Sequence, residues 1–204
     1  MMSAAMEITD KPAAADHEIH PLLRDRWSPR SFCRESLHED AIRRLLEAAR
    51  WSASCFNEQP WRYLVAPRSD EAAFQAMLGC LMESNRTWAK NAGVLMIACA
   101  RTTFSRNDKP NRHAWHDVGL ATAQLTAQAT EMGLGVHQMA GFSSDAARKV
   151  YGISEGFEPV AAIAIGKLAP VDALPDDLRE RELAPRSRKP MSEIAFSGSW
   201  DQAY

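Results

Sequence analysis

The strongest constraint on the fold is a continuous apolar run at residues 94–100, Val-Leu-Met-Ile-Ala-Cys-Ala. A run of strand length without polar alternation is typical of a β-strand that is covered on both faces. Residues 159–166 form a second run of this kind, and shorter strands are expected at 62–66 and 134–139. The sequence therefore predicts a sheet with covering layers on both of its faces.

Helices are expected between these strands. Residues 36–39, Ser-Leu-His-Glu, have the form of a capping box and precede an apolar helix face formed by Ile42, Leu45, Leu46 and Ala49. Further helices are expected at about 70–83, 86–90 and 143–150. The segment 114–132 contains no Lys or Arg and many small residues, which predicts a buried central helix at a subunit interface.

The composition is that of one soluble domain. With 204 residues, of which 46% are hydrophobic and 25% charged, the chain can bury a core of ordinary size. A net charge of -2 gives no electrostatic case for nucleic acid or an anionic membrane, so an anion would need a local cluster of Arg or Lys. The four dispersed cysteines, the absence of an apolar run of about 20 residues and the absence of a signal-peptide pattern indicate a cytoplasmic protein.

Two boundaries divide the chain. Residues 1–20 are rich in Ala and mixed charge without periodicity and are expected to form a flexible extension. Residues 21–204 are expected to form a single domain. Its last part, from about 169, has Pro at 170, 175, 185 and 190, which favours an arm that lies over a surface.

The segment 52–61, Ser-Ala-Ser-Cys-Phe-Asn-Glu-Gln-Pro-Trp, is the most informative for function. It connects a helix to a strand, and Asn57, Gln59 and Trp61 exceed what a turn needs. Amide side chains offer both a donor and an acceptor, which suits a ligand edge such as a flavin pyrimidine. A well-packed loop around a buried Trp is the alternative interpretation.

Two basic clusters stand at opposite ends of the chain, Arg26-Trp27-Ser28-Pro29-Arg30-Ser31 and Arg186-Ser187-Arg188-Lys189-Pro190. Arg presents a planar fork that matches phosphate oxygens, and Ser adds donors. The clusters could meet around one phosphate if the fold brings the chain ends together. Taken singly, each cluster is more often a solvated basic turn.

Other signatures of chemistry are weak or missing. There is no glycine-rich nucleotide motif and no G-x-S-x-G sequence. His113 and His116 with Asp117 could suggest a metal, but one helical turn without a third partner favours a structural role. Cys55 has no base nearby in sequence. We therefore expect no metal site and no catalytic side chain.

Taken together, these segments resemble the nitroreductase family of FMN-dependent flavoproteins. The resemblance runs from about residue 20 to the end of the chain. It is carried by the order and spacing of Arg26-x-Ser28-x-Arg30-x-Phe32, Ser54-x-x-Asn57-x-Gln59-Pro60-Trp61, Asn85, Met132-Gly-Leu-Gly135, Ala140-Gly-Phe142 and Pro185-Arg-Ser-Arg-Lys-Pro190.

The resemblance implies an α+β homodimer. A central, mostly antiparallel sheet would be wrapped by helices, the C-terminal arm would be domain-swapped onto the partner, and FMN would lie at the dimer interface. The implied FMN-binding residues are Arg26, Trp27, Ser28, Arg30, Ala53, Ser54, Cys55, Asn57, Gln59, Asn85, Ala140, Gly141, Arg186 and Arg188.

These residues match distinct positions of the family. Arg26, Ser28, Arg186 and Arg188 match the phosphate-binding positions, and Arg30 matches a basic residue near N1 and O2 of the flavin ring. Asn85 matches a contact to the pyrimidine edge, and the backbone N–H groups of Ala140 and Gly141 match donors to N5 and O4. The loop with Ala53, Ser54, Cys55 and Asn57 matches the part contributed by the other subunit.

Four positions depart from the family pattern. Ala53 replaces a usual Pro and Cys55 a common Ser, which would make the partner loop more mobile. Ala140 stands where some relatives have Glu, and Trp88 where some have Lys. The last two departures leave the donor preference and the choice of substrate open.

The resemblance further implies ping-pong electron transfer from NAD(P)H through FMN to an electron-poor acceptor such as a nitroaromatic or a quinone. Because the flavin carries the hydride chemistry, no nucleophile or metal is required. Two alternatives remain open: another flavin enzyme on the same fold, such as a dehydrogenase, oxidase or dehalogenase, and a non-catalytic FMN-binding module.

Overall fold

The centre of the molecule is a four-stranded antiparallel sheet in the order β1-β2-β4-β3. The computed structural model describes residues 9–204, so residues 1–8 of the extension expected over 1–20 lie outside the described residues. The strands are β1 (Trp61–Pro67), β2 (Val94–Arg101), β3 (Leu134–Met139) and β4 (Phe157–Lys167). The prediction of an α+β fold around an antiparallel sheet is confirmed.

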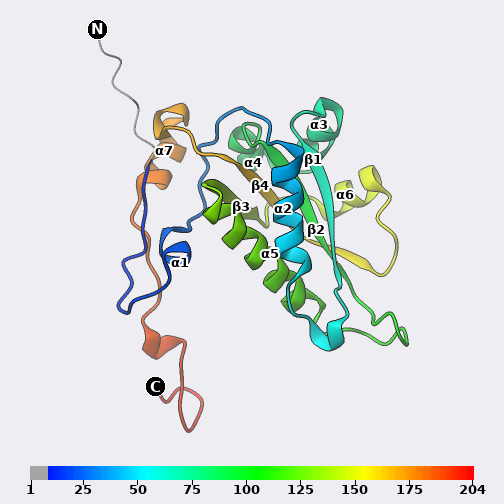
Figure 1. Ribbon diagram of the computed structural model, residues 1–204, viewed down its shortest axis with the longest axis vertical. Helices are drawn as coiled ribbons and strands as arrows, with labels where there is room; N and C mark the ends of the chain where they lie inside the picture. Colours follow the sequence, from blue (N-terminus) through cyan, green and yellow to red (C-terminus); the bar gives the residue numbers. More distant parts are fainter. Residues whose placement is uncertain (1–8) are drawn as a thin grey trace.

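Helices cover both faces of this sheet. On one face are α2 (Glu39–Arg50) and α5 (Ala114–Glu131), which stand together in front of the strands in Figure 1. On the other face are α3 (Glu71–Gly79), α4 (Glu83–Ala89) and α6 (Ser144–Tyr151). Helices α1 (Pro21–Asp25) and α7 (Asp176–Leu183) lie toward the chain ends.

The apolar run in β2 is explained by these two layers. Val94, Met96 and Ala98 belong to the core cluster shared with α2 and α5, whereas Leu95 and Ile97 belong to the cluster shared with α3 and α4. Successive side chains of a strand point to opposite faces. A strand inside a sheet that is covered on both sides therefore has no position left for a polar residue.

The strand register places the connecting loops at opposite ends of the sheet. Trp61 pairs with Ala100 and Pro67 pairs with Val94, so the loop before β1 and the turn between α4 and β2 are separated by the length of β1. For a strand of seven residues this length is about 20 Å.

Two expected helix boundaries were wrong. Helix α2 is capped by His38, whose Nδ1 accepts from Asp40 N at 3.3 Å, and not by Ser36. Leu37 is buried in the core, which keeps the chain extended until Glu39. Helix α3 ends at Gly79 rather than near residue 83, because Leu81 is buried and pairs with Phe142 in an isolated β-bridge.

The two ends of the described chain run side by side, as Figure 1 shows for the blue segment before α1 and the orange arm after α7. Ala13 N donates to Arg24 O at 2.8 Å, and Lys11 Nζ donates to the carbonyls of Glu182 and Ala184, each at 2.6 Å. Beyond this contact the arm leaves the sheet, and the Trp200 side chain in the arm is 83% exposed. Among the described residues, no helix combines the length and apolar character needed to cross a membrane.

Candidate functional site

The first basic cluster lies across the edge strand β3. Pro29 O accepts a hydrogen bond from His137 Nδ1 at 2.9 Å. Gly135 permits the close approach, since a Cβ there would stand 2.5 Å from Pro29 Cγ and 2.6 Å from Leu168 Cδ2. The edge strand and the crossing segment are therefore in direct contact.

The second basic cluster meets the first. Arg186 Nη1 donates to Lys11 O at 2.6 Å and to Arg24 O at 2.7 Å, which fixes the arm beside α1. Arg26 Nη1 donates to Ser28 Oγ at 3.1 Å. Burial lowers the pKa of Arg26, and repulsion from Arg186 and Arg188 lowers it further. The two clusters from opposite ends of the chain therefore form one group.

This group carries an excess of positive charge. Asp25 pairs with Arg24 at 2.7 Å and also attracts Arg186. The buried carboxylate of Glu182 faces Lys11 and Arg30, which belong to a set of five further cations. These cations are Lys11, Arg26, Arg30, Arg186 and Arg188. An anion of multiple charge would relieve their mutual repulsion.

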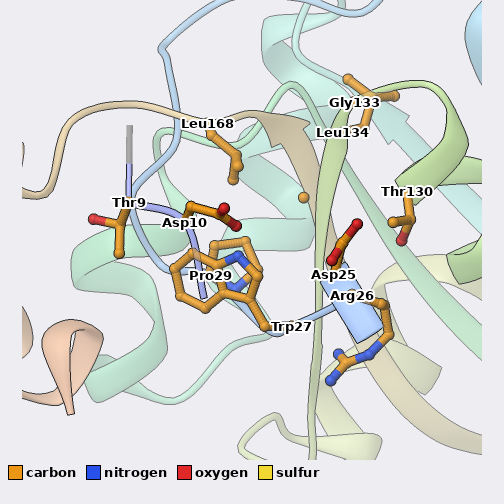
Figure 2. A pocket seen from close by; sticks show the side chains of 11 residues that line it. Thr9, Asp10, Asp25, Arg26, Trp27, Pro29, Thr130, Gly133, Leu134 and Leu168 are labelled. Atoms are coloured by element: carbon orange, nitrogen blue, oxygen red, sulfur yellow. The ribbon is translucent and has the colours of Figure 1, made fainter. Parts of the chain in front are cut away.

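Two cavities adjoin the joined basic clusters, one next to Arg26 and one next to Arg186 and Arg188. A cavity of about 300 Å³ lies beside Trp27 and Pro29, and Arg26 is one of its lining residues. In Figure 2 the Arg26 side chain points away from Leu168. A second cavity, of about 390 Å³, is formed between the N-terminal segment and the arm. Its charged lining residues are Arg186, Arg188, Lys189 and one acidic residue, Asp16. The second cavity therefore has an excess of basic residues, whereas the first combines apolar residues with Asp10, Asp25 and Arg26.

A second group of expected site residues lies past the end of β3. Asn85 Nδ2 donates to Gly141 O at 3.0 Å, and Met82 N donates to the same carbonyl at 2.9 Å. A Cβ at position 141 would stand 2.6 Å from Asn85 Nδ2, so the amide packs directly on glycine. Asn85, Ala140 and Gly141 are therefore brought together.

The loop 53–59 precedes β1 at one edge of the sheet, whereas both other groups adjoin β3 at the opposite edge. Phe56, Asn57 and Gln59 have φ of 53°, 56° and 51°, a left-handed conformation that is uncommon outside glycine. Such backbone persists only where the surroundings impose it, and it concentrates at functional sites. The loop contains Ala53, Ser54, Cys55, Asn57 and Gln59, so these residues do not join the others within one chain.

The buried Asp117 holds this loop. Its Oδ2 accepts from Cys55 N at 3.0 Å, and its Oδ1 lies 3.3 Å from His116 Nδ1. Ser54 Oγ accepts from Gln59 N at 3.0 Å. Asp117 thus accepts a hydrogen bond from the backbone of the loop. The sequence predicted a structural role near this residue but not this contact.

Lys11 and Glu182 are further residues that the sequence did not indicate. Glu182 Oε1 accepts from the backbone N–H groups of Arg30 and Ser31, at 2.7 and 3.0 Å. Lys11 Nζ stands 5.0 Å from the centre of the Trp27 ring. Both residues come from segments of mixed charge, where no periodic signal marks a buried or bound side chain.

The comparisons with known proteins agree on one family. Residues 23–167 match the family model described as Nitroreductase family. An uncharacterised 15.4 kDa protein of Mycolicibacterium smegmatis is 33% identical over 135 residues, which are 66% of this chain and 88% of that protein.

Solved structures extend the agreement to the fold. A crystal structure of an oxidoreductase containing FMN is 36% identical, with a TM-score of 0.86, and the match covers 91% of this chain and 94% of that one. A structure from Desulfovibrio desulfuricans in complex with FMN is 22% identical, with a TM-score of 0.68 and coverage of 90% and 99%. The second likeness concerns the fold alone.

Proposed function

The chain belongs to the nitroreductase family, and from this premise we propose that it is an FMN-dependent oxidoreductase that takes electrons from NAD(P)H. The observation that carries the proposal is the convergence of Arg26, Arg186 and Arg188 from opposite ends of the chain. Guanidinium forks match the oxygens of a phosphate dianion. The FMN in the similar oxidoreductase structure supports the same cofactor here.

The residues present fit FMN. Arg26, Ser28, Arg186 and Arg188 would hold its phosphate, and the excess positive charge described above suits a dianion. Trp27 would close the neighbouring wall, with Lys11 over its ring.

The ring would lie toward the end of β3. There Asn85 would meet its pyrimidine edge, and the backbone N–H groups of Ala140 and Gly141 would face N5 and O4. Arg30 would supply a fixed cation close to N1 and O2. A preorganised charge at the place where negative charge develops favours the reduced form of a flavin. When bound, FMN supplies the hydride chemistry itself, so the chain contributes positioned donors and charges.

We further propose a homodimer in which the partner completes each site. The loop with Ala53, Ser54, Cys55, Asn57 and Gln59 precedes β1, at the edge of the sheet opposite to β3, beside which the other groups lie. The outer face of α5 exposes Trp115 by 47% and Leu120 by 39%. Apolar surface of this kind suits a subunit interface, and the exposed arm would cross to the partner.

The donor and the acceptor would use one pocket in turn, a ping-pong cycle with nitroaromatics, quinones or similar electron-poor acceptors. Ala140 places no charge beside this pocket.

The protein would act in the cytoplasm. The exposed aromatic Phe56, held between Phe104 and Arg106, belongs to the loop that the partner would receive.

The test is an absorbance spectrum of the purified protein loaded with FMN, followed anaerobically after addition of NADPH and then NADH. Rapid bleaching of the flavin bands by either donor is the expected result, and parallel double-reciprocal plots would support the ping-pong order. A flavin that stays oxidised with both donors would favour another flavin enzyme or a binding module. A protein that does not retain FMN would refute the cofactor.

A further inference from the structure

Glu182 is a buried charge in a part of the chain that otherwise lies at the surface. It is 1% exposed and belongs to α7, where the arm begins. A buried carboxylate is costly unless hydrogen bonds and opposite charges compensate it. Here Oε1 accepts from Arg30 N at 2.7 Å and from Ser31 N at 3.0 Å. The carboxylate therefore anchors the turn that carries Arg30 to the arm.

The other carboxylate oxygen attracts Arg30 without binding its N–H groups. Oε2 lies 3.6 Å from Arg30 Nη1, which is too long for a hydrogen bond. This oxygen is buried and has no hydrogen-bond partner among the described residues. The Arg30 side chain remains 27% exposed. The guanidinium is thus held close to the turn while its donors stay free for a ligand.

The same contact ties three segments together. Lys11 Nζ binds the backbone carbonyl of Glu182, and Arg186 binds the backbone carbonyl of Lys11. A shift of Glu182 would therefore move Arg30 and Arg186 relative to each other. These two arginines belong to the ring-facing and phosphate-facing parts of the proposed flavin site.

We infer that Glu182 is a positioning residue of the flavin site, which acts on the flavin through Arg30. The inference rests on the proposed function. The carboxylate fixes the Arg30 turn, and its negative charge reduces the positive potential that Arg30 presents to the ring. The pair therefore makes bound FMN harder to reduce than Arg30 alone would.

The test is the midpoint potential of bound FMN, measured by equilibration with reference dyes, in a double-mutant cycle. Glu182→Gln should shift the potential to more positive values, and Arg30→Gln should shift it to more negative values. In the Arg30→Gln background, Glu182→Gln should produce less than half of the shift it produces in the wild type, because the part that comes from releasing the Arg30 guanidinium is lost and only the direct field of the carboxylate remains. Glu180→Gln removes the same charge from the exposed side of α7 and should leave the potential unchanged.

FMN affinity provides a second readout, from quenching of flavin fluorescence on titration of the apoprotein. Glu182→Gln keeps an oxygen for the two backbone N–H groups and should weaken binding less than threefold. Glu182→Ala removes the anchor and should weaken binding at least tenfold. If Glu182→Gln does not fold, Glu182→Asp, which withdraws the charge from Arg30, should shift the potential in the same direction by less.

The outcomes separate this inference from the proposed function. If the wild type binds and reduces FMN but neither Glu182 variant changes the potential, or the change persists at full size without Arg30, Glu182 does not act through Arg30 and the inference is wrong. If the wild type does not take up FMN, the proposed function itself fails.

Discussion

At the scale of single residues, His137 joins the segment with Arg26 and Arg30 to the sheet. Its Nδ1 donates to Pro29 O, since a carbonyl can only accept, and its ring lies 4.6 Å from the ring of Trp88. Burial is the main cause that lowers the pKa of His137 to about 4, and the nearby positive charge of Arg30 adds to it. The imidazole is therefore neutral at pH 7.

Acidification should destabilise the protein through His137. The folded pKa of about 4 lies below the unfolded value of 6.5, so between these values the unfolded chain binds a proton that the folded chain does not. The contribution of neutral His137 to the free energy of unfolding is complete above pH 6.5. It is lost as the pH falls toward 4, and the total loss is about 3 kcal/mol. Urea unfolding at pH 7 and pH 4.5 measures this loss.

His137→Gln provides the matched comparison, because its amide can still donate to Pro29 O but does not titrate. Between pH 7 and pH 4.5, the unfolding free energy of the variant should fall by ~2.5 kcal/mol less than that of the wild type. Equal losses would mean that His137 is not the responsible group.

Among the candidate site residues, Arg26, Ser28 and Asn85 could be proposed as FMN contacts from the sequence. Asn85 and Gly141, which the resemblance assigns to the same cofactor, are joined by a hydrogen bond at 3.0 Å. Glu182 could not be predicted, since its role depends on α7 packing against a turn that is 152 positions away in the sequence. Neighbouring Glu180 has the same chemistry and stays exposed.

At the scale of elements, α5 supports the loop 53–59 through the side chain of Asp117. Asp117 is 2% exposed and accepts from Cys55 N. The loop has three non-glycine residues with positive φ, so its conformation depends on such tertiary contacts. Helix and loop thus act as one structural unit.

Asp117→Ala should release this loop. The substitution leaves Cys55 N without its acceptor, which should cost about 1–3 kcal/mol of unfolding free energy and increase amide hydrogen exchange over residues 54–59. Glu131→Ala, on the exposed end of the same helix, should change neither quantity. Unchanged exchange in the Asp117 variant would show that the loop holds its conformation without α5.

Element types were predictable where the pattern was long and regular. The apolar run at 94–100 gave β2, and the segment without Lys or Arg gave α5. The start of α2 was wrong because burial of Leu37 overrides the local capping signal of Ser36. Local motifs fail where a neighbouring side chain has a stronger tertiary requirement.

At the scale of the whole molecule, the arm presents a surface that its own chain does not cover. Met191, Ile194, Trp200 and Tyr204 are between 53% and 89% exposed. Figure 1 shows this part of the chain projecting away from the sheet. Exposed apolar residues in such a series are typical of a contact surface, which fits the proposed crossing to a partner subunit.

The arm should therefore contribute to dimer stability. Trp200→Ser should raise the dimer dissociation constant at least tenfold, because a large aromatic buried at an interface often dominates its energy. Val150→Ser, exposed by 50% on α6, should have no such effect. Sedimentation over a concentration series distinguishes the two, and a full-length chain that stays monomeric would contradict the proposed dimer.

The meeting of the two basic clusters also belongs to this scale, and the sequence could offer it only as a possibility. It depends on Arg186 reaching the carbonyl of Lys11, 175 positions away, and that of Arg24. No local pattern encodes a contact of this separation. The central claim is that these clusters together bind the phosphate of FMN.

The most direct test compares FMN with riboflavin, which lacks the phosphate, by fluorescence titration of apoprotein in the wild type and in Arg188→Ala. A charge-assisted hydrogen bond contributes about 1.5–3 kcal/mol, or roughly 10- to 150-fold in affinity. We expect the wild type to prefer FMN, and Arg188→Ala to lose most of this preference while riboflavin binding stays unchanged; Arg181→Ala, exposed on α7, should retain it. Equal affinity of the wild type for FMN and riboflavin would contradict the account.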